Sequence, residues 1–171
     1  VVVAGAVGAA VAVWAGLKWL SSRKKKKKAS QVVVAITGFG KFKGVSANPT
    51  QDVIKALPAH LRQNKLPASV VVDRTTVLEV SGEGCKESLL SIRDSCFQLQ
   101  GQHRVWLHLG VDANATGFKL ERKAWNDADF RCSDERGWQP RQQVIEPQDG
   151  GRTVGVESRL PVRGLVWRLR R

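Results

Sequence analysis

Two aromatic side chains in a glycine-rich loop are the clearest candidates for ligand binding in this sequence. The loop runs from Gly38 to Pro49, and its three glycines allow tight turns that expose the rings of Phe39 and Phe42. The glycine spacing is neither G-x-G-x-x-G nor a loop ending in Gly-Lys-Ser/Thr, so the support for phosphate binding is weak. On the pattern alone, an ordinary connection from strand to helix is the simpler interpretation.

The three cysteines and three histidines form no catalytic or metal-binding pattern. Cys85 and Cys96 flank Leu89 and Ile92 at spacings of 4, 3 and 4 residues, which indicates one apolar stripe of a helix. Both cysteines are therefore better explained as core residues than as nucleophiles. An odd number of cysteines argues against a disulfide framework and favours a reducing compartment. His108 is most simply explained by its place in a strand, and we predict no metal site.

Glu121 lies among three cationic residues, Lys119, Arg122 and Lys123. Such neighbours keep a carboxylate ionised. A surface salt bridge explains the same pattern, and the sequence around Glu121 does not by itself indicate a catalytic role.

The elements that must position these residues follow an α/β pattern. Residues 32–36 are an apolar run that predicts a buried strand of a parallel sheet. Two helices and two further strands follow, in the order helix 51–64, strand 69–80, helix 82–97 and strand 105–109. Ligands bind beyond the carboxyl ends of the strands in such sheets, where the loop of Phe39 would lie.

The net charge of +13 belongs to the two ends of the chain. Residues 18–28 carry seven positive charges, and residues 152–171 carry six against the single acid Glu157. Residues 29–151 contain 15 basic and 14 acidic residues and are nearly neutral. A nucleic-acid-binding domain would carry a basic surface, so we expect no nucleic-acid partner.

Residues 1–20 allow two interpretations. Residues 1–17 are uncharged and lysines follow them, so a transmembrane signal-anchor helix fits, with a basic linker at 21–31 and the domain facing the cytosol. The stretch is only moderately hydrophobic and short for a membrane span, so a segment that makes no anchor fits equally well. The expected location is the cytosol, either free or anchored to a membrane.

Two blocks of this sequence resemble the pyroglutamyl-peptidase I family, also called the pyrrolidone-carboxylate peptidases. The first block is Thr37-Gly38-Phe39, Phe42-Lys43-Gly44 and Asn48-Pro49. The second runs from Val105 to Arg131, and its Trp106-Leu107-His108-Leu109-Gly110 is most similar to the plant members. The resemblance covers residues 32–151 and stops after Gly151.

The resemblance implies a three-layer α/β/α fold with a central mixed sheet, incomplete at its C-terminus. Residues 32–151 would form this partial domain. For residues 152–171, where arginines dominate and periodicity is lost, we expect a tail that is disordered or not native to the domain.

The family removes N-terminal pyroglutamate from peptides with a Cys-His-acid triad, and the resemblance implies no cofactor. Carried over by position, Glu121 matches the acid of the triad. Phe39 and Phe42 match aromatic residues of the pyroglutamyl pocket. Weaker candidates for this pocket are Asn48, Gly110 and Val111.

The nucleophile and the base of the triad have no match in this sequence. The family places them after the position of Gly151, where the chain contains neither cysteine nor histidine. We therefore expect this polypeptide to be inactive. The alternative function is a non-catalytic domain that binds pyroglutamyl peptides or a full-length paralogue, and self-association remains open.

Overall fold

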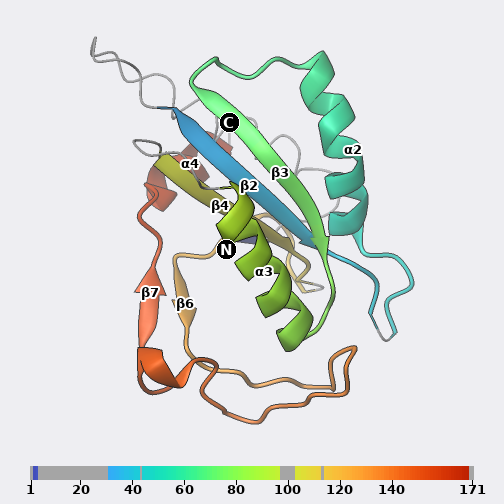
Figure 1. Cartoon of the computed structure of the whole chain (residues 1–171), viewed down its shortest axis with the longest axis vertical. Helices are drawn as coiled ribbons and strands as arrows, with labels where there is room; N and C mark the ends of the chain where they lie inside the picture. Colours follow the sequence, from blue (N-terminus) through green and yellow to red (C-terminus); the bar gives the residue numbers. More distant parts are fainter. Residues whose placement is uncertain (1, 4–30, 43, 97–102, 113, 170–171) are drawn as a thin grey trace.

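The predicted apolar strand is the centre of the structure. The computed structural model describes residues 2–3, 31–42, 44–96, 103–112 and 114–169, which form an α/β fold (Figure 1). Its elements, in chain order, are β1 (Val2–Val3), β2 (Val32–Phe39), α2 (Pro49–Gln63), β3 (Val70–Leu78), α3 (Gly82–Cys96), β4 (His103–Gly110), β5 (Lys119–Leu120), β6 (Lys123–Trp125), the 3-10 helix η1 (Pro147–Asp149), β7 (Gly155–Glu157) and α4 (Val162–Leu169).

The main sheet has the strand order β3-β2-β4-β1-β5. Strand β2 pairs in parallel with β3 on one side and with β4 on the other. Strand β5 runs antiparallel to β1, which makes the sheet mixed. The predicted α/β class is therefore confirmed. The parallel arrangement brings the carboxyl ends of β2, β3 and β4 to one edge, where the connecting loops gather.

The two faces of this sheet are covered unequally. The face that packs on α2 holds the larger core, formed by alternate residues of β2 and by α2: Val32, Val34, Ile36, Ile54 and Leu57. The opposite face has a smaller core among the described residues, which consists of Val33, Ala35 and Ile92 with Trp106 beside them. The helix on this second face, α3, leaves part of the sheet open to the site described below.

The N-terminal helix expected over residues 1–20 is not supported. Val2 and Val3 form β1, which pairs with Leu109 and Gly110 of β4. Valine is β-branched, so it fits the pleated surface of a sheet better than a helix. Residues 1 and 4–30, which include most of the predicted anchor and the basic linker, lie outside the described residues. Within the described ranges, no helix is both long and apolar enough to cross a membrane.

Within residues 152–169, part of the segment for which we expected a disordered or non-native tail, the structure describes a strand and a helix. Strand β7 pairs antiparallel with β6, and α4 follows it. The half-buried residues of α4 are Val162, Leu165, Val166 and Leu169, at the spacing of one helical face. The many arginines of this segment obscure that apolar spacing in the sequence.

Candidate functional site

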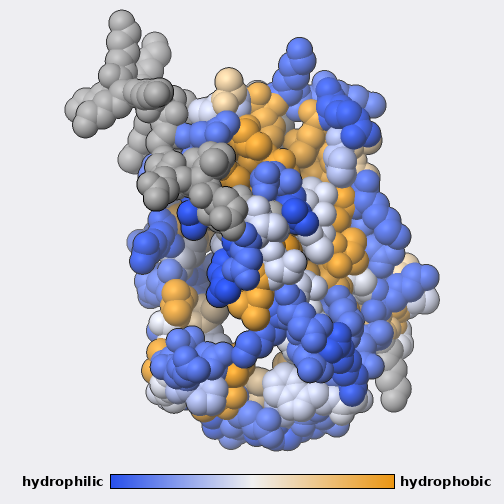
Figure 2. All heavy atoms as spheres, viewed as in Figure 1, coloured by the Kyte–Doolittle hydropathy of each residue, from blue (hydrophilic) through white to orange (hydrophobic). Residues whose placement is uncertain are grey.

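A cavity of about 1510 Å³ lies on the α3 side of the sheet. Its walls are mainly apolar and come from the end of β2, from α3, from β4 and from residues 121–158. Figure 2 shows this face of the molecule hollowed between α3 and the long loop that closes its lower edge. The cavity lies on the sheet face with the smaller core.

The two aromatic rings predicted to bind a ligand both line this cavity. Phe39 ends β2, and Phe42 lies in the loop that follows. The loop is held by hydrogen bonds from the Gly40 amide to the Leu78 carbonyl (2.9 Å) and from the Val45 amide to the Phe42 carbonyl (2.8 Å). Both rings are half-buried, so their faces remain available to a ligand.

Asn48 supports the loop from behind the cavity. Its side-chain oxygen accepts a hydrogen bond from the Thr50 amide (3.1 Å), which caps α2. Its side-chain nitrogen donates to the Gly40 carbonyl (2.9 Å). Asn48 is only 4% exposed and does not line the cavity, so the structure gives it a positioning role for the loop.

Gly110 and Val111 lie away from this cavity. Gly110 ends β4 and pairs with Val3 of β1. Val111 is 46% exposed, and neither residue lines the cavity. The structure therefore brings Phe39 and Phe42 to one place and leaves Gly110 and Val111 outside it.

Glu121 joins the two aromatic residues in this cavity. It lies between β5 and β6 and lines the cavity with an exposed side chain. Its cationic neighbour Lys119 forms an ion pair with Asp112 instead. No ion pair or hydrogen bond occupies the Glu121 carboxylate among the described residues. The carboxylate is therefore available to a partner within the cavity.

His108 is a cavity residue that the sequence analysis did not identify. It lies on β4, and its ring stacks on Trp106 with centroids 5.8 Å apart. Its Nδ1 atom is 2.7 Å from the Thr37 hydroxyl of the neighbouring strand β2. Burial lowers the pKa of His108 to about 4, so the imidazole is neutral near pH 7. The β2–β4 pairing that brings Thr37 and His108 together is not visible in the sequence.

The thiol of Cys85, on the cavity wall, is not activated as a thiolate. The Cys85 thiol donates to the Glu79 carbonyl (3.2 Å), and burial raises its pKa. Cys132 is exposed on the wall. Neither cysteine is hydrogen-bonded to His108 in the part of the chain that the structure describes. The described residues also contain no group of three or more potential metal ligands.

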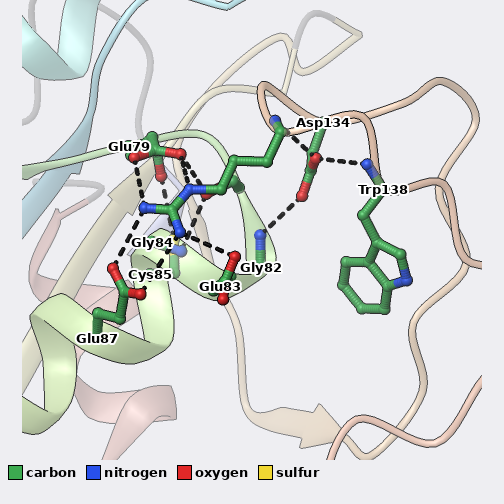
Figure 3. A network of polar contacts seen from close by, with 10 residues as sticks. Glu79, Gly82, Glu83, Gly84, Cys85, Glu87, Asp134 and Trp138 are labelled. Atoms are coloured by element: carbon green, nitrogen blue, oxygen red, sulfur yellow. Dashed lines mark hydrogen bonds and ion pairs between the residues drawn. The ribbon is translucent and has the colours of Figure 1, made fainter.

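One arginine fixes the wall of the cavity to the start of α3. The guanidinium of Arg136 contacts both oxygens of Glu79 (2.7 and 3.1 Å). It also contacts Glu83 (2.9 Å) and Glu87 (3.2 Å), two exposed residues of α3. Figure 3 shows these three carboxylates converging from the end of β3 and from α3. The interaction with Arg136 lowers the pKa of Glu79 below its usual value.

Asp134 completes this connection. Its carboxylate accepts hydrogen bonds from the backbone amides of Gly82 (2.9 Å) and Trp138 (2.9 Å), as Figure 3 shows. A negative charge at the first residue of a helix is favourable, because the amides there lack helical partners. The Trp138 ring lies against Gly82, where an added Cβ atom would be 2.4 Å from it. The segment 134–138 is therefore a fixed wall of the cavity.

Asn126 and Asp127 connect their segment of the chain to residues 146–152. The Asn126 side chain donates to the Glu146 carbonyl (2.8 Å) and the Gly150 carbonyl (2.9 Å) and accepts from the Glu146 amide (2.8 Å). Asp127 forms a two-pronged ion pair with Arg152 (2.7 and 3.0 Å). Arg152, which we had placed in the tail, thus anchors the turn that leads into β7.

Comparison with known proteins connects this site to a family. A family model described as pyroglutamyl peptidase matches residues 32–171, which extends beyond Gly151, where we expected the similarity to end. A pyrrolidone-carboxylate peptidase of Streptococcus pyogenes serotype M4 is 29% identical over 133 residues, which cover 78% of this chain and 55% of the relative. That of Fusobacterium nucleatum is 30% identical over 107 residues, covering 63% of this chain and 44% of the relative.

Solved structures of such peptidases share the fold. The pyrrolidone carboxyl peptidase of Thermus thermophilus is 30% identical with a TM-score of 0.62, covering 82% of this chain and 64% of its own. That of Thermococcus litoralis is 27% identical with a TM-score of 0.67, covering 82% of this chain and 57% of its own. This chain spans about half the length of the curated relatives it matches.

Proposed function

Because the chain belongs to the pyroglutamyl peptidase family, we propose that its cavity binds the N-terminal pyroglutamyl residue of a peptide. The observation that carries this proposal is the convergence of Phe39, Phe42 and Glu121 on one cavity, although Glu121 lies far from the two aromatic residues in the sequence. A pyroglutamyl ring is flat and uncharged, so it packs favourably against aromatic faces. An open-chain N-terminal glutamine carries an ammonium group, which is costly to place in an apolar cavity.

Glu121 is the acid in this proposal. In a Cys-His-acid mechanism the acid accepts a hydrogen bond from the histidine and fixes its orientation, so that the histidine can take the proton of the thiol. An exposed carboxylate at the wall of the cavity, with no hydrogen bond or ion pair among the described residues, suits this role.

We infer that these 171 residues do not supply the cysteine and the histidine of that mechanism. Its sequence contains no cysteine after Cys132 and no histidine after His108. Cys85 is held as a neutral thiol, and the Nδ1 atom of His108 is engaged by Thr37. We therefore propose that the 171-residue polypeptide binds a pyroglutamyl peptide without cleaving it. Release of pyroglutamate that Cys132→Ala abolishes would contradict this.

Calorimetric titration with a pyroglutamyl dipeptide tests the binding. The wild-type chain should bind it, and Phe39→Ala should weaken binding about tenfold, because an aromatic contact to the ring is lost. Phe118→Ala is the matched control, since Phe118 is 41% exposed and does not line the cavity. Equal affinity of wild type and Phe39→Ala, or no binding by the wild type, would refute the proposed pocket.

We also propose that the domain resides in the cytosol. The described cysteines Cys85 and Cys132 are both free, as expected in a reducing compartment. Fractionation of cells that express the tagged chain tests this, and recovery in the membrane fraction would contradict it.

A further inference from the structure

The Thr37–His108 pair joins two polar side chains of neighbouring strands on the α3 face of the sheet. Both residues lie on the α3 face, where they follow Ala35 and Trp106 at alternate positions of their strands. Thr37 is 0% exposed, whereas His108 lines the cavity. A buried polar group is costly unless it is hydrogen-bonded. This contact therefore determines which of the two atoms donates the hydrogen bond and which accepts it.

The surroundings of Thr37 fix the tautomer of His108. The Thr37 hydroxyl has one hydrogen-bond partner in the described structure, the Nδ1 atom of His108. If Nδ1 carried the proton, the buried hydroxyl would have no acceptor for its own hydrogen. The favourable arrangement therefore has the hydroxyl donating to Nδ1, which leaves the imidazole proton on Nε2.

The Nε2 atom opens into the cavity. Among the described residues no group is hydrogen-bonded to it, and no buried side-chain nitrogen or oxygen lacks a partner. Nε2 is therefore accessible, and the accessible space beside His108 is the cavity that Phe39 and Phe42 also line. The stacked Trp106 ring fixes the plane of the imidazole. The result is one oriented N–H donor in a mainly apolar cavity.

We propose that the Nε2–H group of His108 donates a hydrogen bond to the lactam carbonyl oxygen of a bound pyroglutamyl residue, with Thr37 as the positioning residue that fixes the donor tautomer. This inference rests on the proposed function, since it places the pyroglutamyl ring in the same cavity. A neutral donor suits a neutral carbonyl. An analogue without that carbonyl leaves the donor unpaired in apolar surroundings, so the pair gives selectivity for the lactam.

The test compares two ligands on two matched variants. The ligands are a pyroglutamyl dipeptide and its cyclopentanecarbonyl analogue, which keeps the five-membered ring and lacks the lactam. His108→Phe keeps a ring that stacks on Trp106 and removes the donor. We expect it to weaken binding of the pyroglutamyl dipeptide roughly tenfold and to leave the affinity for the analogue unchanged. His103→Phe is the control on the same strand, because His103 is exposed and lies outside the cavity wall.

Nitrogen-15 NMR of the wild-type histidines gives an independent readout. We expect His108 to show the Nε2–H tautomer, and Thr37→Val should abolish that preference. The outcomes separate the two proposals. If the wild type binds no pyroglutamyl dipeptide, the proposed function fails and this inference fails with it. If the wild type binds but His108→Phe binds equally tightly, or if His108 carries its proton on Nδ1, only the role of His108 is overturned.

Discussion

Arg136 shows how single residues shape the proposed site. Its guanidinium holds three carboxylates, Glu79, Glu83 and Glu87, that would otherwise repel one another at the start of α3. Exposed ion pairs add little to stability on their own, but a planar two-pronged contact fixes geometry. The consequence is a defined position for segment 134–138, which lines the cavity.

We predict that Arg136→Gln lowers the melting temperature most at low ionic strength. Salt screens the repulsion among the three carboxylates. The difference in melting temperature between the wild type and Arg136→Gln should therefore shrink in concentrated salt. Arg136 lowers the pKa of Glu79 below its usual 4.5, so the contribution of the pair is complete above that pH and is lost as the pH falls through the lowered pKa. The deficit should therefore also disappear in acid.

Arg136→Lys is the matched control for this substitution. It keeps the positive charge and loses the planar guanidinium group. Its melting temperature should therefore lie between those of the wild type and Arg136→Gln. Calorimetric scans at two salt concentrations and at neutral and acidic pH make the comparison. A deficit for Arg136→Gln that is independent of salt and pH would show that side-chain packing, rather than charge, is responsible.

At this scale the sequence predicted three residues that come together in the candidate site. Phe39, Phe42 and Glu121 were identified through their place in a family motif, and the structure brings them to one cavity. His108 was not identified, because its significance depends on Thr37. These two residues become neighbours only through the pairing of β2 with β4, which a linear pattern does not specify.

At the scale of elements, the close approach of β2 to α2 positions the aromatic loop. A Cβ atom at Gly38 would lie 2.7 Å from the Thr50 carbonyl oxygen and 2.8 Å from a side-chain carbon of Ile54. The Phe39 amide donates to the Thr50 hydroxyl (2.9 Å) at the same contact. Glycine at position 38 therefore allows the first turn of α2 to lie directly against the end of β2.

We predict that Gly38→Ala destabilises the fold by about 1–3 kcal/mol, because the added methyl group forces β2 and α2 apart. Chemical denaturation measures this change. Gly117→Ala is the control, since no atom lies within 4 Å of its added Cβ, and it should change stability by less than about 0.5 kcal/mol. Equal stability of the two variants would mean that the contact between β2 and α2 is not tight.

The central elements could be predicted from sequence, and the peripheral ones could not. Strand β2 begins with a continuous apolar run, which favours a buried parallel strand. Strands β1 and β7 have two and three residues, too few for any periodicity, and they form through pairing with distant segments. In α4 the apolar stripe is only half-buried, and the surrounding arginines hide it.

At the scale of the whole molecule, the net positive charge belongs to the two ends of the sequence. The excess of positive charge lies in residues 18–28 and 152–171, while the residues between them are nearly neutral. The cavity is mainly apolar and lies on the less covered face of the sheet. A partner of this cavity is therefore expected to be recognised through ring packing and a few hydrogen bonds, rather than through a strong electrostatic field.

The central claim is that this polypeptide binds an N-terminal pyroglutamyl residue and does not remove it. Saturation-transfer NMR of a pyroglutamyl peptide with the wild-type chain tests both parts in one sample. The account predicts saturation of the pyroglutamyl ring protons, weaker saturation of the rest of the peptide, and an unchanged peptide spectrum after prolonged incubation. Absence of saturation at the ring, or signals of free pyroglutamate, would contradict it.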